Sequence, residues 1–145
     1  MYEPMNEPIM TIQIFVEDSQ ISSMEGPYGA VTMIPFTGRV ESELFTGEIL
    51  PGAVDVQVEN PAGSRNMCAK YMFQGKDREG NACHLFVENN GYFSKADRQA
   101  AFFHACPGFM TDSPVLGAFL CQARFRSEVW PTGNGIEIRI YDVLQ

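Results

Sequence analysis

The sequence has few basic residues: 10 Lys and Arg stand against 18 Asp and Glu, which gives a formal net charge of -8. A chain with this excess of negative charge repels the phosphate groups of nucleic acids and of anionic lipids. It also lacks any apolar run close to the roughly 18 residues that a membrane-spanning helix needs. We therefore expect a soluble protein that has neither nucleic acid nor a membrane as a partner.

The N-terminus has neither the basic start nor the apolar stretch of a secretory signal peptide, which predicts a cytoplasmic location. In that reducing compartment the four cysteines, Cys68, Cys83, Cys106 and Cys121, should remain thiols. None belongs to a Cys-x-x-Cys pair or has a histidine at ligand spacing, so we expect no metal site. We interpret them as small buried hydrophobic residues, and a Cys106–Cys121 pair facing each other across a hairpin is the alternative.

Catalytic motifs are also missing, since the chain has no Gly-x-Ser-x-Gly elbow, phosphate-binding loop, His-Glu-x-x-His sequence or dinucleotide fingerprint. We therefore expect no cofactor. His84 and His104 lie in separate predicted strands, where they could act as acid and base or could be local hydrogen-bonding or surface residues. Whether the protein is an enzyme stays open at this point.

Strand patterns, by contrast, run through the whole chain. The clearest is at the C-terminal end, where Ile136, Ile138 and Ile140 alternate with charged and aromatic residues. Further extended segments are predicted at residues 10–18, 30–42, 44–50, 53–58, 67–74, 82–89, 102–109 and 116–129. The polar residues 19–29 read as a connection.

Glycine, proline and asparagine mark the breaks between these segments. Pro51-Gly52 predicts a turn, and the charged residues 75–80, with a glycine at each end, predict a hairpin loop. Asn89-Asn90-Gly91 predicts the end of a strand, and Pro35 and Gly38 predict a bulge or bend. Residues 94–101 begin with a capping serine and allow one helical turn.

A chain of 145 residues with 11 phenylalanines fits one domain with a large aromatic core. We therefore predict a single domain over residues 1–145, with residues 1–9 as a flexible segment. The fold class is all-β: a single antiparallel barrel of about eight to ten strands with at most one short helix, because closure removes exposed strand edges. A two-layer sandwich is the alternative.

One predicted strand carries the best candidate for a site. In residues 53–58 three valines share one face, while Ala53, Asp55 and Gln57 share the other. In an open sheet the polar face would meet water, whereas in a barrel it could line a cavity. If the polar faces point inward, Asp55, Lys70, Asn89 and one of Arg124, Arg139 or Tyr141 are predicted to meet around an apolar pocket.

Several short sequences, in this order and spacing, resemble one known family. They are Ile34-Pro-Phe-Thr-Gly38, Gly47-x-x-Leu50-Pro51-Gly52-x-x-Asp55, Ala69-Lys70-Tyr71, Val87-x-Asn89-x-Gly91, Cys106-Pro107-x-Phe109 and Arg139-Ile140-Tyr141-x-Val143. With these residues the chain is similar, over residues 26–143, to the bacterial and fungal family catalogued as domain of unknown function three-two-three-seven. The resemblance implies a compact antiparallel barrel, lipocalin-like in outline, and no established activity.

The resemblance also implies where ligand-binding residues would lie. It makes Asp55, Asn89 and Tyr71 candidates for the barrel interior. Lys70 and His104 stand where the family is expected to have arginine, and Cys121 stands where it is expected to have asparagine. Lysine keeps the positive charge of arginine but lacks its planar, two-pronged guanidinium.

Two functions are compatible with these observations. The first is a barrel that binds, and could isomerise or cyclise, a small apolar metabolite with a polar handle, through the candidates Asp55, Lys70, Tyr71, Asn89, His104, Arg139 and Tyr141. In it Asp55 would accept a hydrogen bond or a proton, Lys70 would balance its charge, and Asn89 and Tyr71 would orient the ligand. The second is a homo-oligomeric module without a cavity, assembled through Phe102, Phe103, Phe109 and Trp130. A polar-lined pocket of roughly 300 Å³ or more would favour the first.

Overall fold

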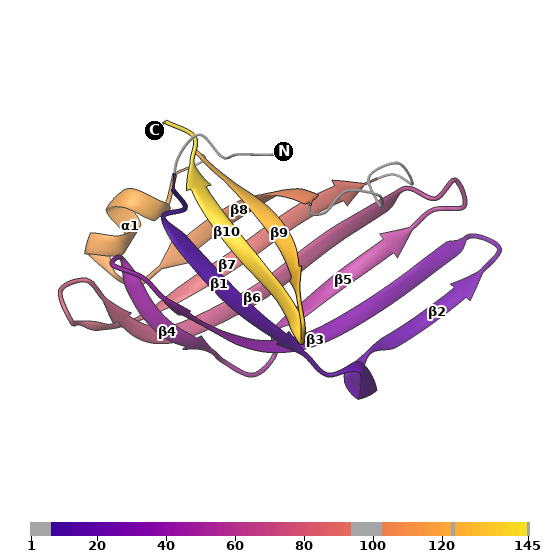
Figure 1. The fold of residues 1–145 in the computed structure, drawn as a ribbon, viewed down its shortest axis with the longest axis horizontal. Coiled ribbons are helices and arrows are strands. Elements are labelled where there is room, and N and C mark those ends of the chain that lie inside the picture. The colour runs from indigo at the N-terminus through magenta and orange to yellow at the C-terminus, as the bar shows by residue number, and fades with distance from the viewer. Residues whose placement is uncertain (1–6, 94–102, 123, 145) are drawn as a thin grey trace.

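The structure, a computed structural model, describes residues 7–93, 103–122 and 124–144. Within them it has ten strands, one short 3₁₀ helix and one α-helix (Figure 1). The elements are β1 (Met10–Val16), η1 (Asp18–Gln20), β2 (Ser22–Gly26), β3 (Gly29–Glu41), β4 (Phe45–Ile49), β5 (Val54–Glu59), β6 (Arg65–Asp77), β7 (Ala82–Phe93), β8 (Phe103–Thr111), α1 (Pro114–Leu120), β9 (Phe125–Thr132) and β10 (Gly135–Asp142).

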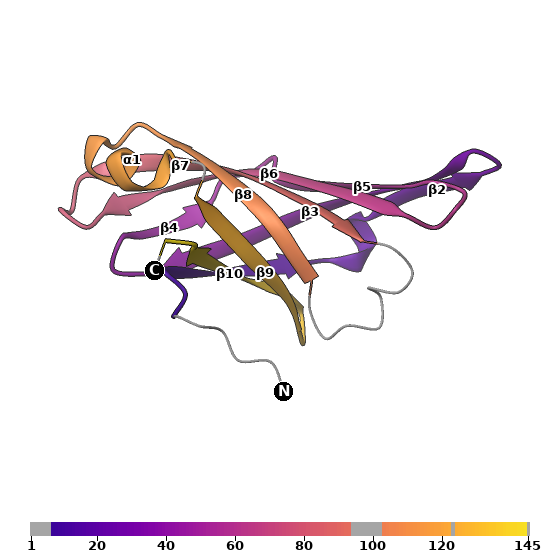
Figure 2. The same ribbon diagram turned by 90° about the horizontal axis from the view of Figure 1, so that it is seen from above.

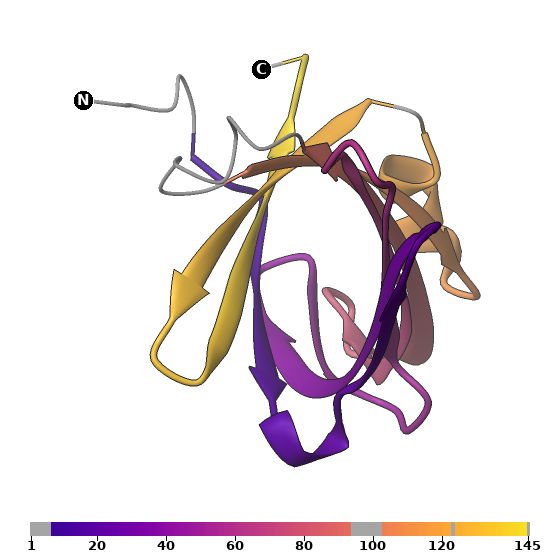
Figure 3. The same ribbon diagram turned by 90° about the vertical axis from the view of Figure 1, so that its right-hand side faces the viewer.

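Eight strands close into an antiparallel barrel, seen along its length in Figure 3. The circuit runs from β1 through β10, β9, β8, β7 and β6 to β5 and β3, and β3 pairs with β1 to complete it. All of these pairings are antiparallel. The predicted all-β barrel with a short helix is therefore confirmed, and the sandwich alternative is wrong.

The long strand β3 organises the closure because it has two successive partners on each side. Residues 30–35 pair with β5 and residues 39–41 with β4, while on the other side residues 22–26 of β2 precede β1 as partners. The strands β4 and β5 thus share one position between β3 and β6, and the predicted Pro51-Gly52 turn lies between them. Gly52 adopts a φ of 106°, which favours glycine.

Pro35 and Gly38 do not interrupt β3, which continues across both residues for 13 positions. Near them its partners change, from β2 to β1 between residues 33 and 36 and from β5 to β4 between residues 35 and 39. A Cβ at Gly38 would lie 2.2 Å from the backbone oxygen of Gln13 on β1, so glycine is required there by close approach of two backbones. The predicted bulge is wrong, because β3 pairs with β5 and with β1 in unbroken register. The two residues lie instead where β3 meets β1 and the barrel closes.

The inner face of the barrel holds the apolar core. Alternate residues of the barrel strands point inward, among them Ile12 on β1, Phe73 on β6, Leu85 on β7 and Ile140 on β10, all fully buried. Edge-to-face aromatic contacts, such as Phe45–Phe73 and Phe109–Phe125, fill the half of the interior nearer α1. Large phenylalanines therefore close that half.

The helix α1 corrects the prediction of a continuous strand over residues 116–129. Ser113 caps the helix, accepting a hydrogen bond from Leu116 N at 3.1 Å, and Pro114 occupies the first turn. Leu116 and Leu120, one helical turn apart, are both buried. The helix lies at the opposite end from the β2–β3 hairpin (Figures 1 and 2). Within the described ranges, no helix has the length and apolarity needed to cross a membrane.

Other segments also differ from the expectation. Residues 19–29 contain β2 rather than only a connection, and β7 continues through Asn89-Asn90-Gly91 to Phe93, since all three pair with β6. The predicted hairpin loop at 75–80 is confirmed, although β6 extends to Asp77. Cys106 and Cys121 are exposed, unlike the buried Cys83, and all four cysteines are thiols. The helical turn predicted at 94–101 and residues 1–6 lie outside the described residues.

Candidate functional site

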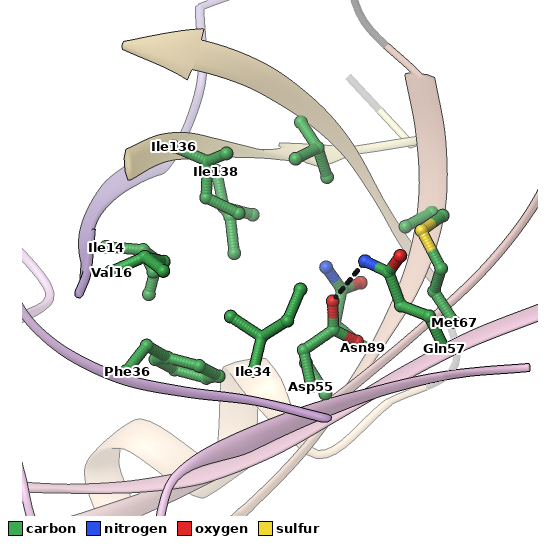
Figure 4. A pocket seen from close by; sticks show the side chains of 13 residues that line it. Ile14, Val16, Ile34, Phe36, Asp55, Gln57, Met67, Asn89, Ile136 and Ile138 are labelled. Carbon is green, nitrogen blue, oxygen red and sulfur yellow. Dashed lines mark hydrogen bonds between the residues drawn. The ribbon is translucent and has the colours of Figure 1, made fainter. Parts of the chain in front are cut away.

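A cavity of about 140 Å³ lies inside the barrel, next to the end where β9 turns into β10 (Figure 4). Its wall is mostly aliphatic, with three polar side chains gathered on the side formed by β5 and β7. The residues that line it are Ile14, Val16, Ile34, Phe36, Asp55, Gln57, Met67, Ala69, Asn89, Ala105, Val129, Ile136 and Ile138. It is smaller than the pocket of roughly 300 Å³ that we expected of a metabolite-binding barrel, yet the interior is not filled.

Strand register places the two main polar groups in one row. Asp55 on β5 lies opposite Ala69 on β6, and Ala69 lies opposite Asn89 on β7. In this row only the small methyl group of Ala69 separates them, so the carboxyl and amide groups both reach the same cavity. Figure 4 shows both groups pointing into the cavity.

Of the two carboxyl oxygens of Asp55, one accepts a hydrogen bond from a described residue and the other does not. Gln57 Nε2 donates a hydrogen bond to Asp55 Oδ2 at 2.9 Å, and Arg65 Nη1 donates to Gln57 Oε1 at 2.9 Å. Asp55 Oδ1 is buried and has no hydrogen-bond partner in the part of the chain that the structure describes. A buried acceptor without a partner lowers the stability of the folded state, and such groups are typical of sites that bind a ligand or take part in a reaction.

A hydrogen bond to its side-chain oxygen fixes the orientation of Asn89. Ser127 Oγ, on β9, donates to Asn89 Oδ1 at 3.0 Å, and both side chains are buried. Asn89 Nδ2 donates to none of the described residues. The serine therefore holds the amide so that its two N–H donors remain for another molecule.

Burial dominates the electrostatics of this polar group. It raises the pKa of the Asp55 carboxyl above its ordinary value of 3.8, while the hydrogen bond from Gln57 and the charge of Arg65 oppose the shift. Burial, with the charge of Asp55, also raises the pKa of Tyr71. Tyr71 therefore stays neutral, and its buried hydroxyl has no described partner.

Tyr71 faces the interior as predicted, but in the row next to Asp55, opposite Val87. It packs edge-to-face on Phe36, with ring centroids 5.2 Å apart, and does not line the cavity. Lys70 is on the outer face, where its Nζ lies 3.5 Å from Glu88 Oε1 and its side chain is 59% exposed. The expected meeting of Lys70 with Asp55 is thus wrong. Ala69 lies opposite Asp55 and faces inward, so its neighbour Lys70 points to the outer face.

Arg139 and Tyr141 lie on the outside of β10, since Ile138 and Ile140 take the inner face. The Arg139 guanidinium donates to Glu137 Oε2 at 2.6 Å and lies over the Trp130 ring. Tyr141 lies beneath Arg126, and its hydroxyl donates to Glu128 at 3.4 Å. These residues build a hydrogen-bonded outer layer on β9 and β10, separate from the cavity.

The remaining candidates are also outside the cavity. His104 is exposed on the outer face of β8. Arg124, one residue before β9 begins, pairs with Asp142 at the end of β10. Among the residues expected to form an assembly surface, Phe109 is buried inside and Trp130 is partly covered by Arg139. Phe102 and the Phe103 side chain lie outside what the structure describes. Self-association remains a prediction.

Sequence reasoning missed two parts of this site. Gln57 was not named as a site residue, although the strict alternation of residues 53–58 put it on the same face as Asp55 and was the signal that could have found it. Ser127 gave no signal, because it fell inside a segment read as one long strand. Among the described residues, no three His, Cys, Asp or Glu side chains are grouped to hold a metal ion.

Solved structures share this barrel. A protein of unknown function from Clostridium acetobutylicum matches with a TM-score of 0.74 at 23% identity, covering 98% of this chain and 99% of that one. RPA1785 from Rhodopseudomonas palustris, described as a conserved protein of unknown function, matches with a TM-score of 0.70 at 23% identity, covering 92% and 93%. A β-barrel-like protein from Acinetobacter baumannii matches with a TM-score of 0.68 at 18% identity, covering 98% and 99%. At these identities the likeness concerns the fold.

Sequence comparisons give the same grouping. The family model described as "Protein of unknown function (DUF3237)" matches residues 4–130. The UPF0311 protein CA_C3321 of Clostridium acetobutylicum is 29% identical, and the match covers 74% of this chain and 75% of that protein.

Proposed function

This chain belongs to the DUF3237 family of proteins of unknown function, and we propose that its barrel binds one small, mostly apolar molecule carrying a single polar group. The observation that supports this function is the cavity with an aliphatic wall and the polar side chains Asp55, Gln57 and Asn89 on one side. A pocket of mainly apolar lining with a few convergent polar groups is the usual form of a small-molecule site.

The cavity volume limits the ligand to about one ring. An apolar cavity of about 150 Å³ can hold benzene, and the present one measures about 140 Å³. A molecule of this size gains only a few kcal/mol from burial, so we expect dissociation constants of about 0.1–1 mM for simple ring compounds.

The polar side chains define the handle of the ligand. Asp55 Oδ1 can accept a hydrogen bond, and Asn89 Nδ2 can donate one. Cyclohexanone fits the size and can accept a hydrogen bond from Asn89 Nδ2. Cyclohexanol has the same size and can in addition donate a hydrogen bond to Asp55 Oδ1. We expect each to bind more tightly than a hydrocarbon ring of the same size, because a hydrocarbon leaves the buried polar atoms without partners.

Thermal unfolding in the presence of cyclohexanone tests this function. At about ten times the dissociation constant a ligand stabilises the native state by about 1.4 kcal/mol, so the Tm should rise by about 3–4 °C. Ala69→Leu places a larger side chain between Asp55 and Asn89 and should abolish the rise without removing a polar group. Ala118→Leu, on the exposed side of α1, is the matched control and should retain it. An equal rise in Ala69→Leu, or no rise in the native sequence, would refute binding in this cavity.

A further inference from the structure

The polar side of the cavity has the parts that a proton transfer at carbon requires. Asp55 has one oxygen, Oδ2, held by Gln57 and the other, Oδ1, buried without a partner. A carboxylate fixed through one oxygen keeps the other in a constant direction, as a general base needs. Its position next to an aliphatic wall puts it against the carbon atoms of a bound ring rather than against water.

The second part is a hydrogen-bond donor at a fixed place in the same row. Asn89 lies across Ala69 from Asp55, and Ser127 holds its amide by the oxygen. The Nδ2 donors are therefore available for an acceptor atom of the ligand. A fixed amide donor is a common way to stabilise negative charge that develops on a carbonyl oxygen.

The aliphatic wall raises the proton affinity of the base. Burial lifts the pKa of Asp55, and the opposing effects of Gln57 and Arg65 are smaller. A carboxylate with a raised pKa is a stronger base, and a value closer to the working pH makes proton transfer more efficient.

From this geometry we infer that Asp55 moves a proton between carbon atoms of a small cyclic carbonyl compound while Asn89 Nδ2 holds the carbonyl oxygen. The inference rests on the proposed function, because the same cavity must first bind the compound. It goes further by naming the substrate class and the role of each side chain.

The reaction balances without a co-reactant. For a β,γ-unsaturated ketone, the Asp55 carboxylate takes a proton from the carbon between the carbonyl group and the double bond. The electrons of that C–H bond form a new C=C bond, and the electrons of the carbonyl double bond move to the oxygen, which accepts a hydrogen bond from Asn89. The protonated Asp55 then returns its proton to the γ carbon. The electrons on oxygen re-form the carbonyl bond, the new C=C bond shifts to the α,β position, and the electrons of the original double bond form the γ C–H bond, which yields the conjugated ketone and restores the carboxylate.

Cyclohex-3-en-1-one is the probe, because it has one ring and its product, cyclohex-2-en-1-one, absorbs in the ultraviolet. We expect the protein to accelerate this isomerisation above the buffer rate, and the rate to rise with pH as Asp55 ionises. Asp55→Asn should lower the protein-dependent rate by about 100-fold or more, the usual contribution of a general base. Asn89→Ala should lower it by about 100–1,000-fold. Asp18→Asn, an exposed position, is the matched control and should not change it.

Binding is measured on the same samples by the Tm shift with cyclohex-2-en-1-one. A shift in the native protein without acceleration would overturn the proton-transfer role and leave the binding function intact. Equal rates in the native protein and Asp55→Asn would also overturn it, because Asp55 would then only hold the ligand. Absence of both the shift and the acceleration would overturn the inference together with the proposed function.

Discussion

Asp55 is the residue whose chemistry differs most from that of a surface acid. Its carboxyl faces an aliphatic cavity, one oxygen has no described partner, and burial raises its pKa. An ionised carboxylate in this place costs stability, since the hydrogen bond from Gln57 and the charge of Arg65 only partly replace water. Proteins retain such groups mainly where a ligand or a reaction uses them.

The raised pKa of Asp55 gives a stability prediction with a definite sign. In the unfolded chain this carboxyl ionises near its ordinary value of 3.8, whereas in the folded protein it ionises at a higher pH. The folded state therefore loses stability relative to the unfolded state as the pH rises from about 4 through the folded pKa, and the loss is complete above it. Asp55→Asn should remove this loss and keep the Gln57 hydrogen bond.

Urea unfolding of Asp55→Asn and the native protein at pH 4 and pH 8 measures this effect. The variant should gain stability relative to the native protein between the two pH values, by about 1 kcal/mol at pH 8. If the free energies of unfolding of the variant and the native protein differed by the same amount at both pH values, the folded state would not shift the pKa of Asp55. A loss of several kcal/mol at pH 8 would show that Asp55 is a structural anchor.

At this scale the sequence predicted part of the site. Alternation placed Asp55 on the polar face of its strand, and the family resemblance implied that Asp55 and Asn89 lie inside; the closed barrel makes both residues line the cavity. Alternation also shows that Lys70 and Tyr71, as neighbours, cannot both face inward. For Arg139 the inner face of β10 belongs to isoleucines, but only the closed barrel decides which face is internal.

At the scale of elements, α1 is attached to the β6–β7 hairpin by a buried polar contact. Ser113 Oγ donates to Asp77 Oδ2 at 2.7 Å and accepts from Leu116 N. The other Asp77 oxygen, Oδ1, accepts from Glu79 N and Asn81 N in the hairpin turn. One serine thus caps the helix and orders the turn, and its hydrogen bond is the largest cause that lowers the pKa of Asp77.

Removing the Ser113 hydroxyl should therefore cost more than a helix cap alone. Ser113→Ala removes the cap, worth about 1 kcal/mol, and leaves a carboxylate oxygen of Asp77 without its side-chain donor. We expect a loss of about 2 kcal/mol in the free energy of unfolding, measured with urea. Ser22→Ala, at an exposed position of β2, should stay within about 0.5 kcal/mol, and an equal effect of the two changes would contradict this role of Ser113.

Element boundaries followed from the sequence where turn residues and alternation agreed, as at the loop after Asp77. They failed where local chemistry was ambiguous. The apolar segment from Leu116 to Leu120 fits a strand or a short buried helix equally well, and the capping position of Ser113 was the missed signal. Gly91 reads as a break, yet it stays in β7 without a positive φ because β6 and β8 pair with it on both sides.

At the scale of the whole molecule, closure of the barrel turns a polar strand face into an internal site. An eight-stranded barrel has room for its own side chains and one small ligand. Here aromatic rings fill the half nearer α1, and small or branched side chains leave the cavity in the other half. The sequence predicts the barrel but not this division, because the volume that remains depends on which side chains meet across the interior.

A methyl NMR titration with cyclohexanone, with the δ1 methyl groups of isoleucine labelled, tests directly whether a small molecule binds inside the barrel. Four isoleucines line the cavity: Ile14, Ile34, Ile136 and Ile138. Ile12 and Ile140 are fully buried in the core and do not line it, so they are internal controls. We expect saturable shifts at the four lining residues and small changes at the two controls. In Ala69→Leu, whose larger side chain fills the cavity, the shifts at the four lining residues should be lost. Shifts confined to other residues, or no saturable shift at any of the four, would contradict a ligand site in the barrel.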